Sequence, residues 1–301
     1  MVDHTTAVNT VLTPWRSGAG RITSTMTTGE GPCMSQSMFD DRLSEFRQWQ
    51  SSPWGRLRYR IVAANLSRHL PDRPLSVLDI GGGNGLDAIE LAARGHHVAI
   101  VDISEESLAE ARSTAAERGL TPRISTHLGD VAAIGRDFEA NGVDAVMLHN
   151  VLQYVSDPSG VFEAMASPLR ADGVVSVLAP NAHADPLLSA VRTLDLDEAL
   201  RLLDSSARYS AAYQAGTRAC FPENVETDLA AAGLQVIARY GVRSVCDYIT
   251  SESQKADPEF YTKLERLELA LADRVPYIYT ARFFHIIAAP AALREGVPER
   301  R

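Results

Sequence analysis

The stretch that decides the fold is LSVLDIGGGNG at residues 75–85, followed by HHVAIVD at residues 96–102. An apolar strand is expected to end at Asp79, and a glycine-rich turn and a helix follow it. Glycines at this place let a ligand lie against bare backbone, where a Cβ would collide with it. An acid at the end of the second strand, Asp102, can accept hydrogen bonds from both hydroxyls of a ribose. The two segments together predict a site for an adenosine-containing cofactor.

The spacing of the glycines distinguishes two kinds of adenosine cofactor. Dinucleotide enzymes favour G-x-G-x-x-G, which places a pyrophosphate on a helix N-terminus. Here the order is D-x-G-x-G-x-G, in which Asp79 precedes Gly81 and Gly83 and no arginine lies nearby. Asp79 would repel a pyrophosphate, but it suits the amino group and sulfonium of S-adenosylmethionine. A glycine turn that only packs a helix on a strand is the structural alternative, and the acid about 20 residues further on argues against it.

Strands and helices alternate around this motif. Strands are expected over 75–79, 97–101, 123–127, 143–148 and 173–179, and helices over 86–94, 104–118, 131–139 and 158–169. This alternation is typical of a doubly wound α/β fold with a mostly parallel sheet. Two further strands are expected in LQVIARYGVRSV (234–245) and PYIYTARFFHIIAAP (276–290), with a helix between them.

The rest of the chain divides into an extension, one domain and a tail. Residues 1–37 are rich in Thr, Ser and Gly, and we expect them to be disordered. Residues 38–290 form the predicted domain, and residues 291–301 are expected to be a disordered tail. Within the domain, residues from about 182 to 221 contain no obvious strand and predict a helical cap.

Composition indicates a cytoplasmic enzyme that binds no membrane. The formal net charge of -9 and the pI near 5.4 argue against non-specific attraction to nucleic acid. Cys33, Cys220 and Cys246 lack the spacing of a metal site, so we expect reduced thiols and no metal. No apolar run approaches the roughly 18 residues that a membrane span needs.

Residues 38–181 and 222–290 resemble the bacterial tRNA 5-carboxymethoxyuridine carboxyl methyltransferases, which are class I S-adenosylmethionine-dependent enzymes. The matching segments are FDD (39–41), GRLR (55–58), LDIGGGNG (78–85), ARGHHV (93–98), LHNVLQYVSDP (148–158), PNAH (180–183), YGVRSVCDY (240–248) and PYIYTARFFH (276–285). The resemblance implies a seven-stranded Rossmann-like sheet whose last strand is antiparallel. It also implies that the cofactor is lined by Arg58, Gly81, Gly82, Asp102, Asp130 and His149.

Several of these residues also have a physical reason to contact the cofactor. Arg58 could pair with the methionine carboxylate, or it could be an exposed helical arginine. Asp130 could accept from the adenine amino group or cap a helix. His149 leaves the fourth strand where the sulfonium must lie, and it could orient substrate or be a structural, hydrogen-bonded group. Gly83, Ile103 and Gly129 flank these positions and complete the predicted cofactor site.

The chain departs from the family in the cap. The resemblance implies a lysine-rich loop there, whereas residues 203–221 carry only Arg208 and Arg218 as cations. Arg243 and Arg282 remain as candidate clamps for a substrate carboxylate. The alternative for either is an ion pair with a local acid such as Asp247 or Glu268.

An aromatic stripe near the chain's end is a further candidate for the pocket wall. Tyr277, Tyr279 and His285 would share one strand face, where core packing is the alternative to lining a pocket.

These observations predict an S-adenosylmethionine-dependent methyltransferase that esterifies the carboxylate of a small acidic metabolite, with His149, Arg243 and Arg282 orienting the substrate. One alternative keeps the family's role on the wobble uridine of tRNA. Another is a cofactor-binding scaffold that acts as an isomerase or cyclase without methyl transfer. A nicotinamide dehydrogenase is disfavoured by the glycine spacing.

Overall fold

The computed structural model describes residues 43–130, 134, 138–210 and 215–291. The strands are β1 (Ser76–Ile80), β2 (His97–Asp102), β3 (Ile124–Leu128), β4 (Val143–His149), β5 (Leu169–Pro180), β6 (Ala207–Ser210), β7 (Ala215–Arg218), β8 (Leu234–Val242) and β9 (Phe283–Pro290). The extension 1–37, most of the helix expected over 131–139 and most of the tail lie outside the described residues.

Helices connect these strands. The α-helices are α2 (Leu43–Ser51), α3 (Pro53–Ser67), α4 (Leu86–Ala93), α5 (Glu105–Glu117), α7 (Pro158–Ala166), α8 (Ala184–Leu188), α9 (Leu196–Asp204), α10 (Pro222–Ala231), α11 (Glu252–Ala256), α12 (Pro258–Leu271) and α13 (Tyr277–Thr280). Short 3-10 turns are η1 (Thr121–Arg123), η3 (Leu152–Tyr154) and η5 (Cys246–Tyr248), and η4 (Ser189–Thr193) is a π-helical turn. Among the described residues, no helix is long and apolar enough to cross a membrane.

Seven strands form one sheet in the order β3-β2-β1-β4-β5-β9-β8. Neighbouring strands from β3 to β5 pair in parallel, and β9 runs antiparallel to both β5 and β8. The doubly wound, mostly parallel sheet predicted from the sequence is therefore confirmed. The strand order reverses between β1 and β4, and ligands of such sheets bind where the carboxyl ends of those two strands meet.

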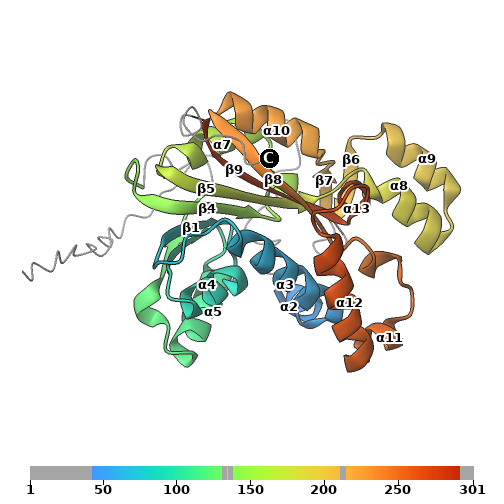
Figure 1. Ribbon diagram of the computed structural model, residues 1–301, viewed down its shortest axis with the longest axis horizontal. Coiled ribbons are helices and arrows are strands. Elements are labelled where there is room, and N and C mark those ends of the chain that lie inside the picture. Colours follow the sequence, from blue (N-terminus) through green and yellow to red (C-terminus); the bar gives the residue numbers. More distant parts are fainter. Residues whose placement is uncertain (1–42, 131–133, 135–137, 211–214, 292–301) are drawn as a thin grey trace, which may run out of the picture. The chain divides into compact units, whose positions relative to one another are not determined.

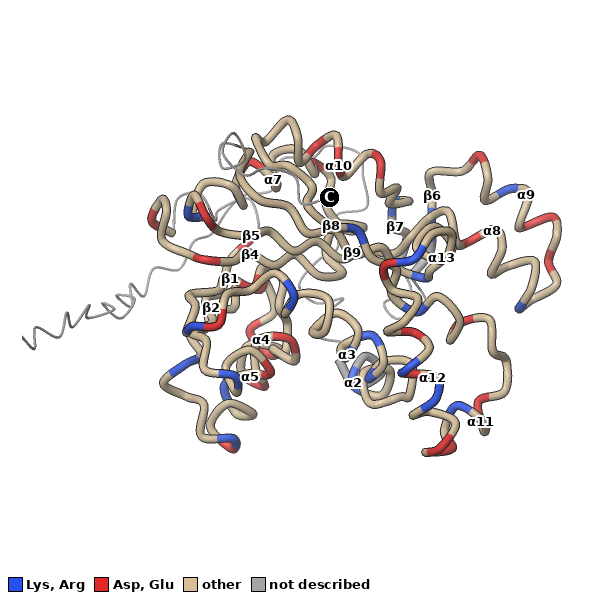
Figure 2. Tube along the Cα trace, in the orientation of Figure 1, with Lys and Arg blue, Asp and Glu red and all other residues tan. Residues whose placement is uncertain are grey.

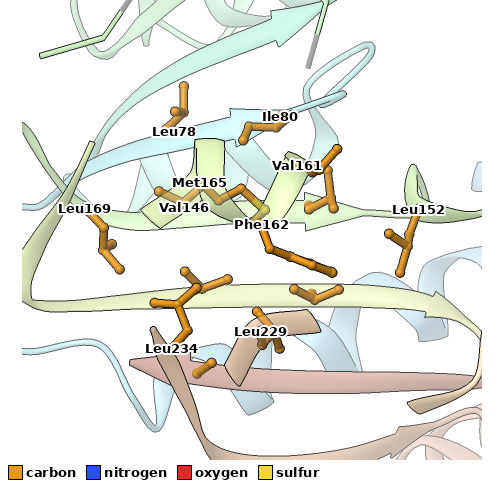
Figure 3. Close-up of a cluster of buried hydrophobic side chains, with 14 of the residues drawn as sticks. Leu78, Ile80, Val146, Leu152, Val161, Phe162, Met165, Leu169, Leu229 and Leu234 are labelled. Carbon is orange, nitrogen blue, oxygen red and sulfur yellow. The ribbon is translucent and has the colours of Figure 1, made fainter. Parts of the chain in front are cut away.

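Helices cover both faces of this sheet (Figure 1). One face packs against α7 and α10 through a cluster that includes Leu78, Val146, Phe162 and Leu229 (Figure 3). The other face packs against α3, α4, α5 and α12. Successive residues of a strand point to opposite faces, so alternate residues of β1, β4, β5 and β9 belong to alternate cores. Polar side chains in these strands can therefore be assigned to one face.

The cap differs from the prediction that it contains no strand. It consists of α8, η4 and α9 together with a two-stranded antiparallel hairpin, β6–β7 (Figure 1). Each strand has four residues and forms a sheet of its own. A ladder this short rests on backbone pairing, and it leaves no run of alternating apolar residues for sequence analysis to detect.

The last predicted strand begins later than expected. Tyr277–Thr280 form the short helix α13, and β9 starts only at Phe283. The alternating pattern of YIYT suggested a strand, but Pro276 precedes it and proline suits the start of a helical turn. Tyr277 and Tyr279 therefore do not share a strand face with His285. Both side chains are exposed, whereas His285 is fully buried.

Candidate active site

The glycine-rich turn joins the end of β1 to the start of α4. Gly81, Gly83 and Gly85 have φ values of 65°, 54° and 75°, a left-handed conformation that other residues rarely adopt. A Cβ on Gly81 would collide with the side chain of Val151, which follows β4. A Cβ on Gly82 would lie 2.5 Å from Oδ2 of Asp79. The turn is thus held close to the end of β4 in a form that only glycine permits.

Asp102 binds the same turn from the end of β2. Its Oδ2 accepts a hydrogen bond of 2.8 Å from the Gly83 backbone N–H, and its Oδ1 accepts one of 2.9 Å from the Ser104 N–H. Its backbone carbonyl accepts a 3.0 Å bond from the N–H of Gly129, which follows β3. Three of the predicted cofactor positions, on three different strand ends, therefore lie together.

The remaining predicted adenosine-side residues flank this group. Ile103 is half-buried and directly follows Asp102, and Asp130 is exposed and directly follows Gly129.

A buried ion pair lies on the other side of the turn. Arg58 of α3 is only 2 % exposed, and its Nη1 donates to Oδ2 of Asp87 in the first turn of α4 at 2.7 Å. The same Asp87 oxygen lies 3.1 Å from Nδ1 of His149 at the end of β4. Arg58 is thus a buried, paired arginine and not the exposed helical arginine considered as its alternative.

Of the buried polar side-chain atoms that have no hydrogen-bond partner among the described residues, two belong to predicted cofactor residues. They are Oδ2 of Asp79 and Nε of Arg58. Burial is the largest cause that raises the pKa of Asp79 well above its usual value, and the carboxylates of Asp87 and Asp102 raise it further. A buried acceptor and a buried cationic donor fit the ammonium and the carboxylate of an amino acid. S-adenosylmethionine carries both groups on its methionine end.

The two predicted carboxylate clamps lie next to each other but are already paired. Arg243 directly follows β8 with a φ of 63°, and its backbone carbonyl accepts a 3.1 Å hydrogen bond from the N–H of Arg282. The Arg243 side chain forms a two-point ion pair with Asp247, its Nε lying 2.7 Å from Oδ2. Arg282 Nη1 lies 2.6 Å from Oδ1 of Asp185 in α8. The ion-pair alternative considered for Arg243 is therefore the arrangement observed.

Arg243 and Arg282 differ in burial and in which of their donor atoms lack a partner. Arg243 is buried, and its Nη1 has no partner among the described residues. Arg282 is 33 % exposed and shares Asp185 with Arg208 of the cap, whose Nε lies 2.6 Å from the second carboxylate oxygen. Asp185 thus bridges two arginines, one on the cap and one before β9, and the three groups together carry a net positive charge.

Sequence analysis missed Asp87 and Ser176. Asp87 contacts both Arg58 and His149, and Oγ of Ser176 in β5 lies 2.8 Å from Nε2 of His149. The only signal for Asp87 was its place in the first turn of a helix that follows the glycines, where acids are common for electrostatic reasons alone. A lone serine inside an apolar strand gave no signal for Ser176.

Comparison with known proteins identifies the family. The model of a family described as a methyltransferase domain matches residues 71–228. The tRNA 5-carboxymethoxyuridine methyltransferase of Escherichia coli K12 is 31 % identical over 272 residues, which cover 88 % of this chain and all of that protein. The chain belongs to this methyltransferase family. Its class I fold, its enzyme class and its cofactor, S-adenosylmethionine, agree with the predictions from the sequence.

Other relatives share smaller parts or the fold alone. A ubiquinone biosynthesis O-methyltransferase of Marinobacter nauticus is 32 % identical over 115 residues, or 38 % of this chain and 48 % of that protein. Among solved structures, the 4+2 cyclase SpnF has a TM-score of 0.58 at 17 % identity and covers 84 % of this chain and 93 % of its own. An S-adenosylmethionine dependent methyltransferase from Mesorhizobium loti has a TM-score of 0.52 at 17 % identity, with 76 % and 97 % covered. At these identities the structural likeness concerns only the fold.

Proposed function

We propose that this methyltransferase esterifies a carboxylate of a small acidic molecule. The observation that supports the proposal is the pair Arg243 and Arg282, which the chain brings together at the edge of the sheet where the parallel strands have their carboxyl ends. Planar guanidinium groups bind carboxylates through two parallel hydrogen bonds. Arg282 is partly exposed, and the buried Nη1 of Arg243 has no hydrogen-bond partner in the part of the chain that the structure describes, so both still have donors to offer.

The cofactor would be held by groups on four strand ends and one helix. Asp79 and Arg58 would pair with the ammonium and carboxylate of the methionine moiety, since each has a buried atom that no described residue contacts by a hydrogen bond. Asp102 would accept from the ribose hydroxyls, and the backbone of Gly81, Gly82 and Gly83 would lie against the nucleoside. Ile103, Gly129 and Asp130 would border the adenine, and His149 would lie beside the sulfonium.

Esterification of a carboxylate places modest demands on the protein. When bound, S-adenosylmethionine supplies an activated methyl group that a nucleophile takes by in-line displacement. A carboxylate carries no proton at neutral pH, so the chain needs no general base for it. What the residues supply is orientation of the two reactants, an effect that can contribute on the order of 7–11 kcal/mol.

The charge of the cap favours a small acceptor over a nucleic acid. Residues 182–221 hold five acidic residues, four arginines and no lysine. Figure 2 shows both signs along α9. Asp185 pairs with both Arg208 and Arg282, and Glu198 pairs with Arg201 at 2.6 Å. Binding of tRNA rests largely on contacts between cations and phosphates, and cations already paired with carboxylates contribute little to it.

The second candidate is the reaction that the Escherichia coli relative is named for. That protein is aligned over its whole length, which supports tRNA 5-carboxymethoxyuridine as the acceptor. Because that nucleoside also carries a carboxylate, the two candidates share the arginine pair and the chemistry. They differ in how much nucleic acid the enzyme must hold.

One experiment separates the two candidates. The purified enzyme is given S-adenosylmethionine with a radioactive methyl group and either bulk tRNA or the small-molecule fraction from a strain that lacks the gene. We expect label in the small-molecule fraction, with a rate that changes little with salt. If tRNA is the acceptor, label enters tRNA, and with 6–10 phosphate contacts affinity falls about 10³–10⁵-fold between roughly 50 and 200 mM salt.

A further inference from the structure

A row of polar side chains crosses the face of the sheet that packs against α3 and α4. His149, Ser176 and His285 lie on the adjacent strands β4, β5 and β9, and each alternates with residues that face the opposite core. Tyr240 on β8 is the direct strand partner of His285. The row begins at Asp87, beside the cofactor site, and passes into the apolar interior. All three of His149, Ser176 and His285 are buried.

The row is joined by short hydrogen bonds. Nδ1 of His149 lies 3.1 Å from the Asp87 carboxylate, and its Nε2 lies 2.8 Å from the hydroxyl of Ser176. The same hydroxyl lies 2.8 Å from Nε2 of His285. Nδ1 of His285 is buried and has no hydrogen-bond partner among the described residues. Both ring nitrogens of His149 are therefore committed to groups of the protein itself.

These contacts fix where the protons lie. Asp87 is ionised, because Arg58 and His149 lower the pKa of this buried carboxyl. A carboxylate can only accept hydrogen bonds, so the nitrogen of His149 that faces it, Nδ1, must carry the ring proton. The bare Nε2 then accepts the single proton of Ser176, whose oxygen accepts the N–H of His285. In the reverse direction, His285 would carry its proton on Nδ1, and a donor without a partner would be buried there.

The charged groups around the row agree with two neutral rings. Burial is the largest cause that lowers the pKa of His149, and it outweighs Asp87, which raises that pKa, while Arg58 lowers it. Burial also lowers the pKa of His285 well below its usual value, and the charge of Arg58 lowers it further while that of Asp87 raises it.

The far end of the row is held by its own contacts. The hydroxyl of Tyr240 lies 2.8 Å from Nε2 of His69, and the guanidinium of Arg68 lies 5.5 Å from the Tyr240 ring.

We propose that Ser176 and His285 are positioning residues that hold His149 in its neutral Nδ1–H form and prevent it from taking a proton from the acceptor. This rests on the proposed function and narrows it. The enzyme then methylates acceptors that arrive already ionised, such as carboxylates, and not phenols or ammonium groups, which must lose a proton first. A neutral His149 also avoids placing a second positive charge, in addition to Arg58, close to the positively charged sulfonium of the cofactor.

The test compares His285→Leu with His285→Gln. Gln can place an amide N–H where Nε2–H of His285 lies and still donate to Ser176, so it serves as the matched control. With Leu, no side chain at position 285 donates to the Ser176 oxygen, so the hydroxyl can turn away and accept from a protonated His149, whose pKa should rise. Nitrogen-15 NMR of histidine-labelled protein without cofactor reads the protonation of His149 directly. Calorimetry reads the affinity for S-adenosylmethionine between pH 6 and 8.

We expect the wild type and His285→Gln to show a neutral His149 with the proton on Nδ1 and a cofactor affinity that stays flat with pH. In His285→Leu, His149 should become doubly protonated within this range, and cofactor affinity should fall by up to about tenfold per pH unit below the new pKa. If His285→Leu does not fold, Ser176→Ala serves instead, because it removes the donor to Nε2 and should also raise the pKa of His149.

A wild-type His149 protonated on Nε2, or a His149 that titrates like the wild type in His285→Leu and in Ser176→Ala, would overturn the proposal. Neither measurement needs an acceptor, so failure here leaves the carboxylate reaction standing. Absence of a methyl ester would in turn leave the protonation of the row intact.

Discussion

Replacing Asp79 with Asn should make the cofactor-free protein more stable and its cofactor binding weaker. Asp79 is 2 % exposed, and one of its oxygens has no hydrogen-bond partner among the described residues. A buried polar group left without a partner costs about 1–3 kcal/mol, and an amide of the same shape removes the charge. We therefore expect the free energy of unfolding to rise by about this amount, with roughly 2–4 °C in Tm for each kcal/mol.

The pH dependence of this effect has a definite sign. Burial raises the pKa of Asp79 in the folded protein, so the folded state binds this proton more readily than the unfolded state does. The destabilisation is absent below the unfolded pKa of about 3.9, grows as pH rises through the folded value, and is complete above it. The stability difference between Asp79→Asn and the wild type should therefore shrink as pH falls toward about 4.

The cofactor should stabilise the wild type more than the variant. At a concentration 100 times its Kd, S-adenosylmethionine should stabilise the wild type by about 2.7 kcal/mol. Losing a charged hydrogen bond of about 1.5–3 kcal/mol weakens binding by roughly 10- to 100-fold. At the same concentration the variant should then gain only about 0.4–1.4 kcal/mol.

Thermal unfolding with and without cofactor measures both effects. Asp144→Asn is the matched control, because Asp144 is also buried but is paired with Arg73 and Arg170 at 2.9 and 2.8 Å. This control should lose stability and keep its response to the cofactor. An Asp79→Asn protein that is less stable than the wild type, or that responds equally to the cofactor, would refute the reasoning.

Three further predictions concern single side chains. Asp102→Ala should weaken S-adenosylmethionine binding by about 1.5–3 kcal/mol for each ribose hydrogen bond lost, and calorimetry showing unchanged affinity would remove Asp102 from the site. Arg282→Met should abolish turnover with little change in Tm. Arg243→Met should abolish turnover and also cost about 3–5 kcal/mol of stability, because it leaves the buried Asp247 without its ion-pair partner. Full turnover in both variants would contradict the proposal that these arginines bind the substrate carboxylate. Burial raises the pKa of Cys220 and of Cys246 to about 12, so neither thiol should react with a thiol reagent until the protein unfolds, and rapid labelling of the native protein would show otherwise.

The fold could be predicted from the sequence because its signals are local. A strand, a glycine turn and a helix follow one another within 20 residues around Asp79, and the alternation of strands and helices then determines a parallel sheet. The glycines at 81, 83 and 85 have the left-handed conformation that only their residue type accommodates easily. The hairpin β6–β7 and the helix α13 escaped prediction because each of these three elements has only four residues. The two strands show no alternation of apolar and polar residues, and the alternation in YIYT wrongly suggested a strand for α13.

Only part of the candidate site could be predicted from the sequence, because the residues that contact one another there are far apart along the chain. Asp87 and His149 are separated by 62 residues, and Ser176 and His285 by 109. Nothing in a single strand shows that its one polar residue meets another on the next strand. The pairing of Arg243 with Asp247, four positions apart, was by contrast within reach of sequence reasoning.

The measurement that tests the central claim most directly is the chemical stability of the transferred methyl group. The enzyme is incubated with methyl-labelled S-adenosylmethionine and the small-molecule fraction described above, and the labelled product is then treated with mild alkali. Our account predicts that the label is released as volatile methanol, because a methyl ester is hydrolysed by base. Label that remains bound after alkali, as an ether, amine or carbon-linked methyl group would, contradicts the assignment of a carboxylate acceptor.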